Sequence, residues 1–382
     1  MYKYLDSQQT ITEESFRVKK LDNLLIGGQP TIKLHAPFTE DQKHPAIVGA
    51  AILPGRGMNI FQLQAFLPGH GLFNMLASIP LAEAADYFSD SDDDSLGNRS
   101  FMVGGAILLP FAGRIRGNGF SQGGVITVSI LNKAVTIPAN WSSGGNSHRE
   151  KVAHHGLILK RGMHSIHTGS DTSQAFVEAR FNAEDYGCGW PGNALHTITG
   201  TLTESGFDLS VNTKNTGREQ LPVSTGWHPY FTLPSQNREK MELSLNANSR
   251  LEVNNYDDVF PTGGIIPIRN TKHDFVSNGG KTLGSMYLDD CYVDLQKNGI
   301  HETVTTLYDP SSNYGLNVSA NHVVNAVQIY APTDKSFVAI EPQMNLPDPF
   351  NRSVWGERDT GMKILKENEE TTYSVRVSLF QK

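Results

Sequence analysis

Residues 196–215 read HTITGTLT, then Glu204-Ser205-Gly206, then FDLSVNTKN, and this stretch decides the fold class. In each arm, apolar and polar side chains alternate with a period of two, which is typical of half-buried β-strands. Because a short turn containing Gly joins the arms, the pattern predicts a β-hairpin. Its apolar face would carry Ile198 and Leu202 together with Leu209 and Val211.

The same pattern recurs along the chain. It predicts a second hairpin from Glu302–Leu307, the turn DPSSNYG and Leu316–Ala320. Helical periodicity is scarce, and its best candidate, Leu72–Tyr87, is interrupted by Pro80. Many short strands separated by turns predict an all-β sandwich or barrel. Further strand candidates are Val125–Leu131, Met241–Leu245, Cys291–Leu295, Ala326–Tyr330, Phe337–Ile340 and Tyr373–Phe380.

The chain of 382 residues shows no internal repeat and no Pro- or Ser-rich linker. The simplest division is an irregular N-terminal extension, residues 1–44, followed by one domain, residues 45–382. The first twenty residues are polar and lack the apolar core of a secretion signal. The longest apolar stretches, near residues 45–53 and 103–111, are shorter than the ~18–20 residues of a membrane helix. These features favour a cytoplasmic protein with no membrane partner.

Composition excludes several function classes. The formal charge is −7 and no run of Lys or Arg occurs, which argues against nucleic acid as a partner. Cys188 and Cys291 are too few for a disulfide framework or a four-thiolate metal site, so we expect buried thiols of a reducing compartment. A phosphate-binding loop is missing, and the GxSxG match GFSQG, residues 119–123, leads into the predicted strand Val125–Leu131 rather than into the helix of a nucleophile elbow. We expect no cofactor, and a monomer or homodimer.

Three histidine and carboxylate motifs remain as candidates for chemistry. The first is His154-His155-Gly156, within KVAHHGLI. On a strand, adjacent side chains point to opposite faces, so one of the two imidazoles at most would face a pocket. His148, His164 and His167 lie nearby, which leaves a metal site open as an alternative to a hydrogen-bonding or a surface histidine.

The second motif is GWHPYFTLP, residues 226–234. His228 lies in an aromatic setting, with Trp227 before it and Tyr230 after it. Aromatic walls pack against sugar rings, and partial burial shifts the pKa of an imidazole. A sugar site with Trp227 in its wall is one interpretation. A core histidine bonded to a backbone carbonyl is the other.

The third motif is FVAIEPQMNLPDPFN, residues 337–351. Glu341 follows an apolar strand of the buried type, and a buried carboxylate must be paired or functional. Gln343, Asn345, Asp348 and Asn351 follow it in a turn-rich segment that could bind hydroxyl groups. A structural carboxylate that caps a loop is the competing interpretation.

Two further positions could bind a sugar. Arg114, within PFAGRIRGNGF, has a fork of donors that suits sugar oxygens, although a surface arginine is an equal alternative. Asp289 and Asp290, within YLDDCYVDL, stand at the start of a strand, where one would point inward and the other outward.

Together and in this order, these segments resemble the aldose 1-epimerase (galactose mutarotase) family. The resemblance runs from about Ala46 to the C-terminus, and GWHPYFTLP and IEPQMNLPDPFN are its most specific pieces. It implies a large antiparallel β-sandwich, the galactose mutarotase-like supersandwich, with few short helices and a sugar site in a cleft. The family commonly has Asn before its Arg, where this chain has Gly113. It also has Asn two residues ahead of its Leu-His-Gly, where this chain has Val152-Ala153-His154-His155. These departures leave the sugar preference open.

Matched motif by motif, the resemblance implies Glu341 as general base and His228 as general acid. It also implies sugar-binding roles for His155, Arg114 and Asp289, and we add Gln343 as a further hydroxyl-binding group. The expected reaction interconverts the α and β anomers of a monosaccharide by ring opening. It needs only a positioned base and acid, which we expect to meet across an open, β-lined cavity without a metal.

Three rival functions stay open at this point. An epimerase of hexose 6-phosphates would need extra cations at the rim of the cleft. A non-catalytic carbohydrate-binding protein could keep the same fold. A glycoside-processing enzyme would need a second carboxylate at ~5–9.5 Å from Glu341, for which Asp289 and Asp348 are the candidates.

Overall fold

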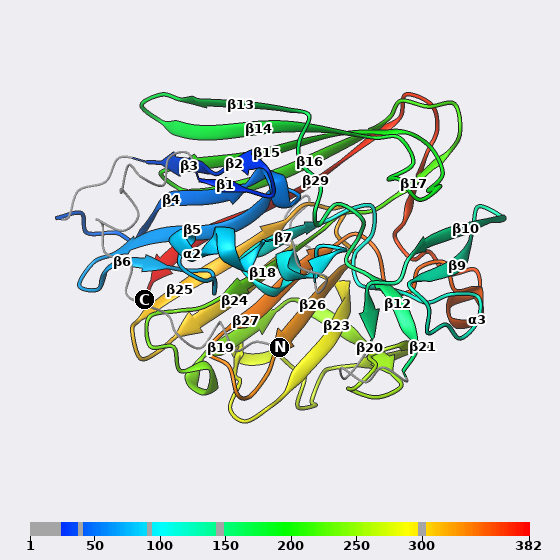
Figure 1. The fold of residues 1–382 in the computed structure, drawn as a ribbon. Coiled ribbons are helices and arrows are strands. Elements are labelled where there is room, and N and C mark those ends of the chain that lie inside the picture. The colour runs from blue at the N-terminus through cyan, green and yellow to red at the C-terminus, as the bar shows by residue number, and fades with distance from the viewer. Residues whose placement is uncertain (1–23, 37–40, 90–93, 143–148, 297–302) are drawn as a thin grey trace.

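The computed structural model describes five stretches of the chain, residues 24–36, 41–89, 94–142, 149–296 and 303–382 (Figure 1). Two large antiparallel sheets dominate them, which confirms the expected all-β sandwich. Within the described residues, no helix is long and apolar enough to span a membrane.

The first sheet has nine strands and contains the hairpin predicted at residues 196–215. In that hairpin Ile198 pairs with Val211, and Leu202 pairs with Phe207. Ile198 and Leu202 are fully buried, so truncating either to Ala should cost about 2–5 kcal/mol. In order across the sheet, the strands are β13 (Ser165–Ser170), β14 (Gln174–Ala183), β15 (Ala194–Thr203), β16 (Gly206–Asn215), β29 (Glu370–Gln381), β25 (Tyr314–Ala320), β24 (Thr303–Asp309), β19 (Glu242–Leu245) and β22 (Lys281–Thr282).

The second sheet has eleven strands, and the three candidate motifs meet on or beside it. Its order is β21 (Pro261–Pro267), β20 (Ala247–Val253), β23 (Leu288–Leu295), β26 (Ala326–Ala331), β27 (Val338–Gln343), β18 (Gly226–Phe231), β7 (Gly105–Leu108), β5 (Asn59–Leu67), β4 (Ala46–Leu53) and β3 (Ile32–His35), with β6 (Gly71–Asn74) also paired to β5.

One apolar core joins the two sheets. Val211 of the nine-stranded sheet belongs to the same buried cluster as Ile52 and Trp227 of the eleven-stranded sheet. Strand β4 contacts β15, β16 and β29 across this interface. Residues of β18 that alternate with Trp227 therefore point to the other face of the eleven-stranded sheet, away from the core.

Small sheets and short helices complete the described fold. The small sheets are β1 (Leu25–Ile26) with β2 (Gln29–Pro30), β9 (Val125–Ile130) with β10 (Lys133–Pro138), β17 (Leu221–Val223) with β28 (Lys363–Leu365), and β8 (Arg114–Ile115) with β12 (Lys151–His154) and β11 (Trp141–Ser142). The helices of the described chain are α2 (Leu81–Tyr87), α3 (Arg352–Trp355) and the 3₁₀ turns η2 (Pro54–Arg56), η4 (Asn98–Met102), η6 (Arg238–Lys240) and η7 (Ser277–Gly279).

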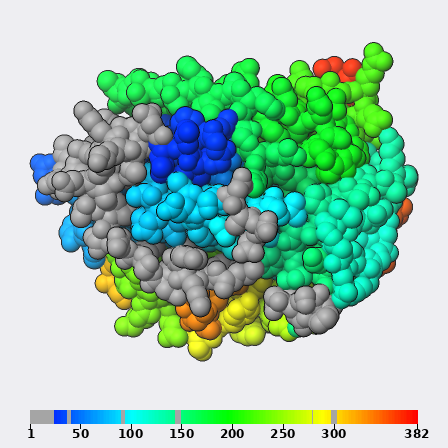
Figure 2. All heavy atoms as spheres, in the orientation of Figure 1, coloured from blue at the N-terminus to red at the C-terminus, as the bar shows by residue number. Residues whose placement is uncertain are grey.

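Two sequence predictions need correction. The helix predicted over Leu72–Tyr87 is confined to Leu81–Tyr87, because Pro80 precedes its first turn and Gly71–Asn74 pairs with β5 as a strand. The extension predicted as irregular, residues 1–44, contains strands β1 to β3, and β3 forms the edge of the eleven-stranded sheet. These strands pack on the body of the molecule, and Figure 2 shows their dark blue atoms beside green ones. Residues 1–23 and 37–40 lie outside the described chain.

Candidate active site

A row of side chains crosses the middle of the eleven-stranded sheet. Glu341 of β27 pairs with Gln328 of β26, which in turn pairs with Cys291 of β23. On the other side, Gly226 pairs with Gln343 and Tyr230 with Ala339, so the register places His228 of β18 directly opposite Glu341. The motifs at residues 226–234 and 337–351 are therefore brought together by strand pairing.

Residues two positions away from this row share its face. Tyr230, Tyr330, Asp289 and Gln343 all do so, and each lines the same open cavity as His228 and Glu341. This cavity has a volume of about 270 Å³. It holds the convergent polar groups and aromatic walls expected of a small-molecule site.

Trp227 does not belong to the cavity, contrary to the prediction from sequence. Its side chain is fully buried in the core between the sheets, and its Nε1 donates a hydrogen bond to the carbonyl oxygen of Gly105. The reason is the period of two along β18, which turns Trp227 inward and His228 outward. Tyr230, which shares the face of His228, supplies the aromatic wall instead.

His228 and Glu341 form a close, buried pair. His228 Nε2 lies 3.2 Å from Glu341 Oε1, and the two side chains are 6% and 3% exposed. They stand side by side on adjacent strands, not across the cavity from each other. Burial lowers the pKa of His228 to about 4 and raises the pKa of Glu341 well above its usual value, the latter with help from the charge of Asp289. His228 Nδ1 and Glu341 Oε2 have no hydrogen-bond partner.

Both histidines of the His154-His155 motif line the cavity, which corrects the expectation that at most one would. His154 ends β12, and His155 leaves the strand with a φ of +60°. This turn stacks the two rings 3.6 Å apart and sets His155 edge-on to His228, with 4.8 Å between ring centroids. Burial lowers the pKa of both imidazoles well below its usual value, so both are neutral near pH 7.

Arg114 and Asp289 form the polar side of the cavity. Arg114 Nη2 lies 4.0 Å from Asp289 Oδ2, and Gln328 Nε2 donates a 2.6 Å hydrogen bond to Asp289 Oδ1. Burial raises the pKa of Asp289, while the charge of Arg114 opposes that rise. Asp290, the next residue, points away and accepts a hydrogen bond from Arg250 at 3.0 Å. One aspartate faces inward and its neighbour does not, as the alternation predicts.

The remaining polar residues of the third motif are structural, with the exception of Gln343. Gln343 lines the cavity and its Nε2 contacts Cys291 Sγ at 3.6 Å. Asn345 bonds the backbone of Ala112 in both directions. Asp348 accepts hydrogen bonds from the backbone N–H of Arg116 and from Asn351. Asp348 is therefore committed to holding two loops together and offers no second carboxylate to the cavity.

Sequence reasoning missed an aromatic and apolar part of the lining. It includes Phe101, Trp141, Tyr256, Val259 and Tyr287. No motif marks these residues, because they come from loops and strand ends whose course depends on tertiary contacts. Tyr287 is the exception, because it is the first residue of the YLDDCYVDL segment that was selected for its aspartates.

A metal ion could be held by the central groups. His155, His228 and Glu341 each offer one ligand atom, and these atoms lie within 4.8 Å of one another. Two imidazoles and a carboxylate are a donor set that Zn²⁺ accepts. The same three groups can equally bind and exchange protons with hydroxyl groups, which is the chemistry that the rest of the polar lining favours.

The fold and this site define a class: galactose mutarotase-like β-sandwich proteins with an imidazole–carboxylate cavity on one sheet. A family model described as aldose 1-epimerase matches residues 80–378, more than half of the chain. The chain therefore belongs to the aldose 1-epimerase family, as its motifs indicate.

Solved structures agree on the fold. A galactose mutarotase-like protein from Clostridium acetobutylicum has a TM-score of 0.69 at 18% identity, covering 91% of this chain and 98% of that chain. An aldose epimerase homologue from C. elegans has a TM-score of 0.66 at 17% identity, covering 92% and 98%. A galactose 1-epimerase from Lactobacillus acidophilus NCFM has a TM-score of 0.62 at 18% identity, covering 92% and 98%. No curated protein sequence matches the chain.

Proposed function

We propose that this protein is an aldose 1-epimerase that interconverts the α and β anomers of a free monosaccharide. The observation that carries the proposal is the buried 3.2 Å contact between His228 and Glu341 in an open cavity. Ring opening requires a base for the proton on O1 and an acid for the ring oxygen O5. Both oxygens are bonded to C1, so two adjacent proton-transfer groups can serve them together.

The pair holds one proton, which burial favours on Glu341 at rest and which crosses the 3.2 Å contact to His228 in the reactive form. In the proposed reaction the Glu341 carboxylate then takes the proton from O1 while the His228 imidazolium gives its proton to O5. The C1–O5 bond breaks as the C1–O1 double bond forms, and rotation about C1–C2 presents the other face of the aldehyde. On closure O5 attacks C1, His228 takes back its proton, and Glu341 returns one to O1. The pair ends with the proton count it began with, so the reaction needs no co-reactant. Each positioned proton transfer is typically worth ~10²–10⁴ in rate.

The hydroxyl groups away from C1 need fixed partners during the rotation. Arg114, Gln328 and Gln343 offer donors, while Asp289 and neutral His155 offer acceptors. Arg114 Nε is buried without a partner, as is His155 Nδ1. A buried polar atom without a hydrogen-bond partner costs free energy, so a hydrogen bond from either atom to a sugar hydroxyl would be favourable.

The charge of the lining favours a free sugar over a hexose 6-phosphate. Among the lining residues of the described chain, Arg114 is the one Arg or Lys, and its charge acts on the carboxyl groups of Asp289 and Glu341. A phosphate dianion would be repelled by that balance unless further cations approached. The rival epimerase of phosphorylated sugars is therefore less well supported by this cavity.

Polarimetry tests the proposal. Fresh α-glucose, α-galactose and α-glucose 6-phosphate would be followed with purified protein, after subtracting the spontaneous rate. We expect faster equilibration of a free hexose, and a Glu341→Gln loss of at least about 10²-fold. Glu178→Gln, a half-buried carboxylate on β14 of the other sheet that pairs with Arg180, is the matched control. A folded Glu341→Gln protein with the parent rate overturns the assignment of the base. Tight sugar binding without turnover would instead favour a carbohydrate-binding protein.

A further inference from the structure

The cavity is wider than one sugar ring placed over the acid–base pair. It runs along the eleven-stranded sheet from β18 and β27 to the β20–β21 hairpin, where Val253 and Pro261 line it. Three strand spacings separate β27 from β20, and at about 4.8 Å each they make about 14 Å. A single pyranose held by His228, Glu341 and Asp289 covers only part of this width.

The chemistry of the lining changes along this length. Near β20 and β21 it becomes aromatic and apolar. The rings of Tyr256 and Tyr287 meet edge to face at 5.7 Å, and Tyr287 meets Tyr330 in the same way at 6.3 Å. Tyr256 and Tyr287 are 39% and 38% exposed. Such rings offer large apolar surfaces to a ligand.

We call Tyr256 and Tyr287 the tyrosine platform, and hydrogen bonds of Tyr256 hold it in place. The hydroxyl of Tyr256 donates to Asp290, at 2.9 Å from one carboxylate oxygen and 3.2 Å from the other. Asp290 also accepts a hydrogen bond from Arg250, so its position is fixed from two sides. The Tyr256 side chain is thereby anchored at its polar end while it lines the cavity.

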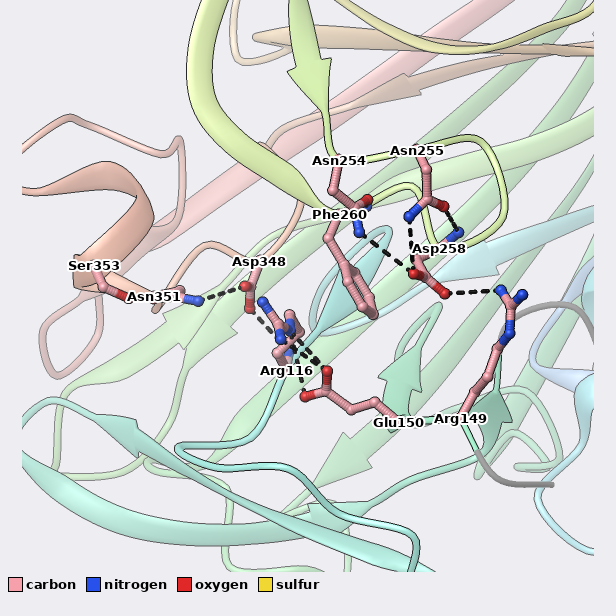
Figure 3. Close-up of polar contacts among 10 residues, drawn as sticks. All are labelled: Arg116, Arg149, Glu150, Asn254, Asn255, Asp258, Phe260, Asp348, Asn351 and Ser353. Atoms are coloured by element: carbon pink, nitrogen blue, oxygen red, sulfur yellow. Dashed lines mark hydrogen bonds and ion pairs between the residues drawn. The ribbon is translucent and has the colours of Figure 1, made fainter. Parts of the chain in front are cut away.

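The connection between β20 and β21 is fastened as well (Figure 3). Asp258 accepts hydrogen bonds from Arg149 at 3.1 Å and from Asn255 at 3.1 Å. Arg116 stacks over Phe260 at 4.5 Å and is itself paired with Glu150. These contacts hold Val259, at a φ of +55°, in the cavity wall. A β-branched residue rarely adopts that φ, and strained residues of this kind cluster at binding sites.

We infer that the hairpin and the tyrosine platform form a second binding subsite, beside the acid–base pair. This inference rests on the proposed function, which requires a free anomeric hydroxyl at C1. Whatever fills the second subsite must therefore be attached to another carbon of the aldose. The chemical class is a reducing sugar that carries a second sugar ring or an apolar group away from C1, such as a disaccharide. Its second ring packs against Tyr256 and Tyr287.

Substrate comparison tests this subsite. The rate kcat/KM would be measured by polarimetry for glucose, maltose, melibiose and 6-O-octanoyl glucose, which carry their extra group on O4 or O6. We expect at least one substituted sugar to exceed glucose about tenfold. Tyr287→Ala should reduce the rate for that sugar about tenfold more than for glucose, whereas Tyr287→Phe keeps the ring and restores the preference. Phe120→Ala removes an aromatic ring that is 68% exposed and does not line this cavity, as a control.

Two results overturn the second subsite: glucose is preferred over every substituted sugar, or Tyr287→Ala lowers all rates alike. Calorimetry keeps the test independent of turnover. If no sugar is epimerised, the proposed function fails, yet the subsite is still supported when a substituted sugar binds about tenfold more tightly than glucose and Tyr287→Ala abolishes the difference. Equal binding of all four probes contradicts it.

Discussion

His228 Nε2 lies 3.2 Å from Glu341 Oε1 although neither residue is exposed beyond 6% of its side chain. Their strands are neighbours, and the register places the two residues opposite each other. Burial disfavours charge on both groups, so the pair resists carrying an imidazolium and a carboxylate at the same time. The proton that the pair binds is therefore shared by two groups with shifted pKa values.

We predict that Glu341 takes up the first proton as the pH falls, and His228 the second. The reason is that burial raises the pKa of Glu341 and lowers that of His228 to about 4. Above about pH 4 the His228 ring should stay neutral, through the range around 6.5 where an ordinary histidine becomes charged. NMR titration of ring-labelled histidine would measure this. A midpoint for His228 at or above 6.5 would contradict it and would mean that attraction to the carboxylate outweighs burial.

Trp227 and His228 show how far the sequence predicts this site. The motif GWHPYF correctly marks a strand with aromatic neighbours, and the hairpin at residues 196–215 is recovered in full. Which aromatic residue faces the cavity depends on the direction of alternation, and in a strand that is buried on both faces the pattern of exposed polar residues does not reveal it. Tyr230 could have been preferred over Trp227, because it lies two residues after His228 and therefore on the same face of the strand.

Other parts of the site depend on backbone conformations that no local pattern shows. His155 faces the cavity beside His154 because its φ is +60°, where a regular strand would have turned it away. Tyr256 and Val259 reach the cavity through a connection fastened by Arg149 and Asp258, which are far apart in the sequence. Contacts of this kind arise only when the whole sheet has formed.

The opposite positions of Trp227 and His228 predict opposite phenotypes. Trp227→Phe should lower the stability measurably, with kcat/KM for sugar kept within about threefold, and Trp227→Ala should cost about 3–5 kcal/mol. His228→Asn should lower kcat/KM by about 10²-fold or more with a smaller effect on stability. Urea unfolding and polarimetry on the same preparations would measure both. A Trp227→Phe protein with parent stability and a strongly raised KM would place the indole at the sugar.

A histidine outside the cavity should make the protein sensitive to acid. His196 is fully buried in β15, with Nδ1 2.8 Å from the hydroxyl of Thr213 and Nε2 2.5 Å from that of Tyr186. Burial lowers its pKa to about 3. Between about pH 6.5 and 3 the unfolded chain binds a proton that the folded chain excludes, so stability falls as the pH falls. At pH 5 this one residue should cost about 2 kcal/mol.

The measurement is a comparison of parent and His196→Gln at two pH values. The variant loses hydrogen bonds, so its free energy of unfolding at pH 7.5 should be lower than that of the parent. At pH 5 this difference should be smaller by about 2 kcal/mol, because the variant lacks the titrating group. His167→Gln, at an exposed position of β13, is the matched control for the substitution itself. An equal deficit of His196→Gln at both pH values would show that the buried imidazole does not govern acid stability.

Gly156 positions the histidine pair, and Gly113 provides a matched comparison. Both have positive φ, +84° and +71°, so an alanine at either position carries a similar backbone strain of about 1–2 kcal/mol. At Gly156 the added Cβ would also lie 2.3 Å from the carbonyl oxygen of Leu109, whereas at Gly113 its nearest neighbours are atoms of Pro347 at 3.6 Å. The backbone at residue 156 cannot shift away from this oxygen without moving the neighbouring His155.

We therefore expect Gly156→Ala to destabilise the protein by about 1–3 kcal/mol more than Gly113→Ala, because overpacking adds to the strain. Urea unfolding measures that difference. The ring-to-ring contact of His155 with His228 should be disturbed as well, which polarimetry would record as a loss of kcat/KM beyond that of Gly113→Ala. Equal stabilities of the two variants would show that the Leu109 carbonyl can move aside, and that the turn after His155 is not what fixes the imidazole in the cavity.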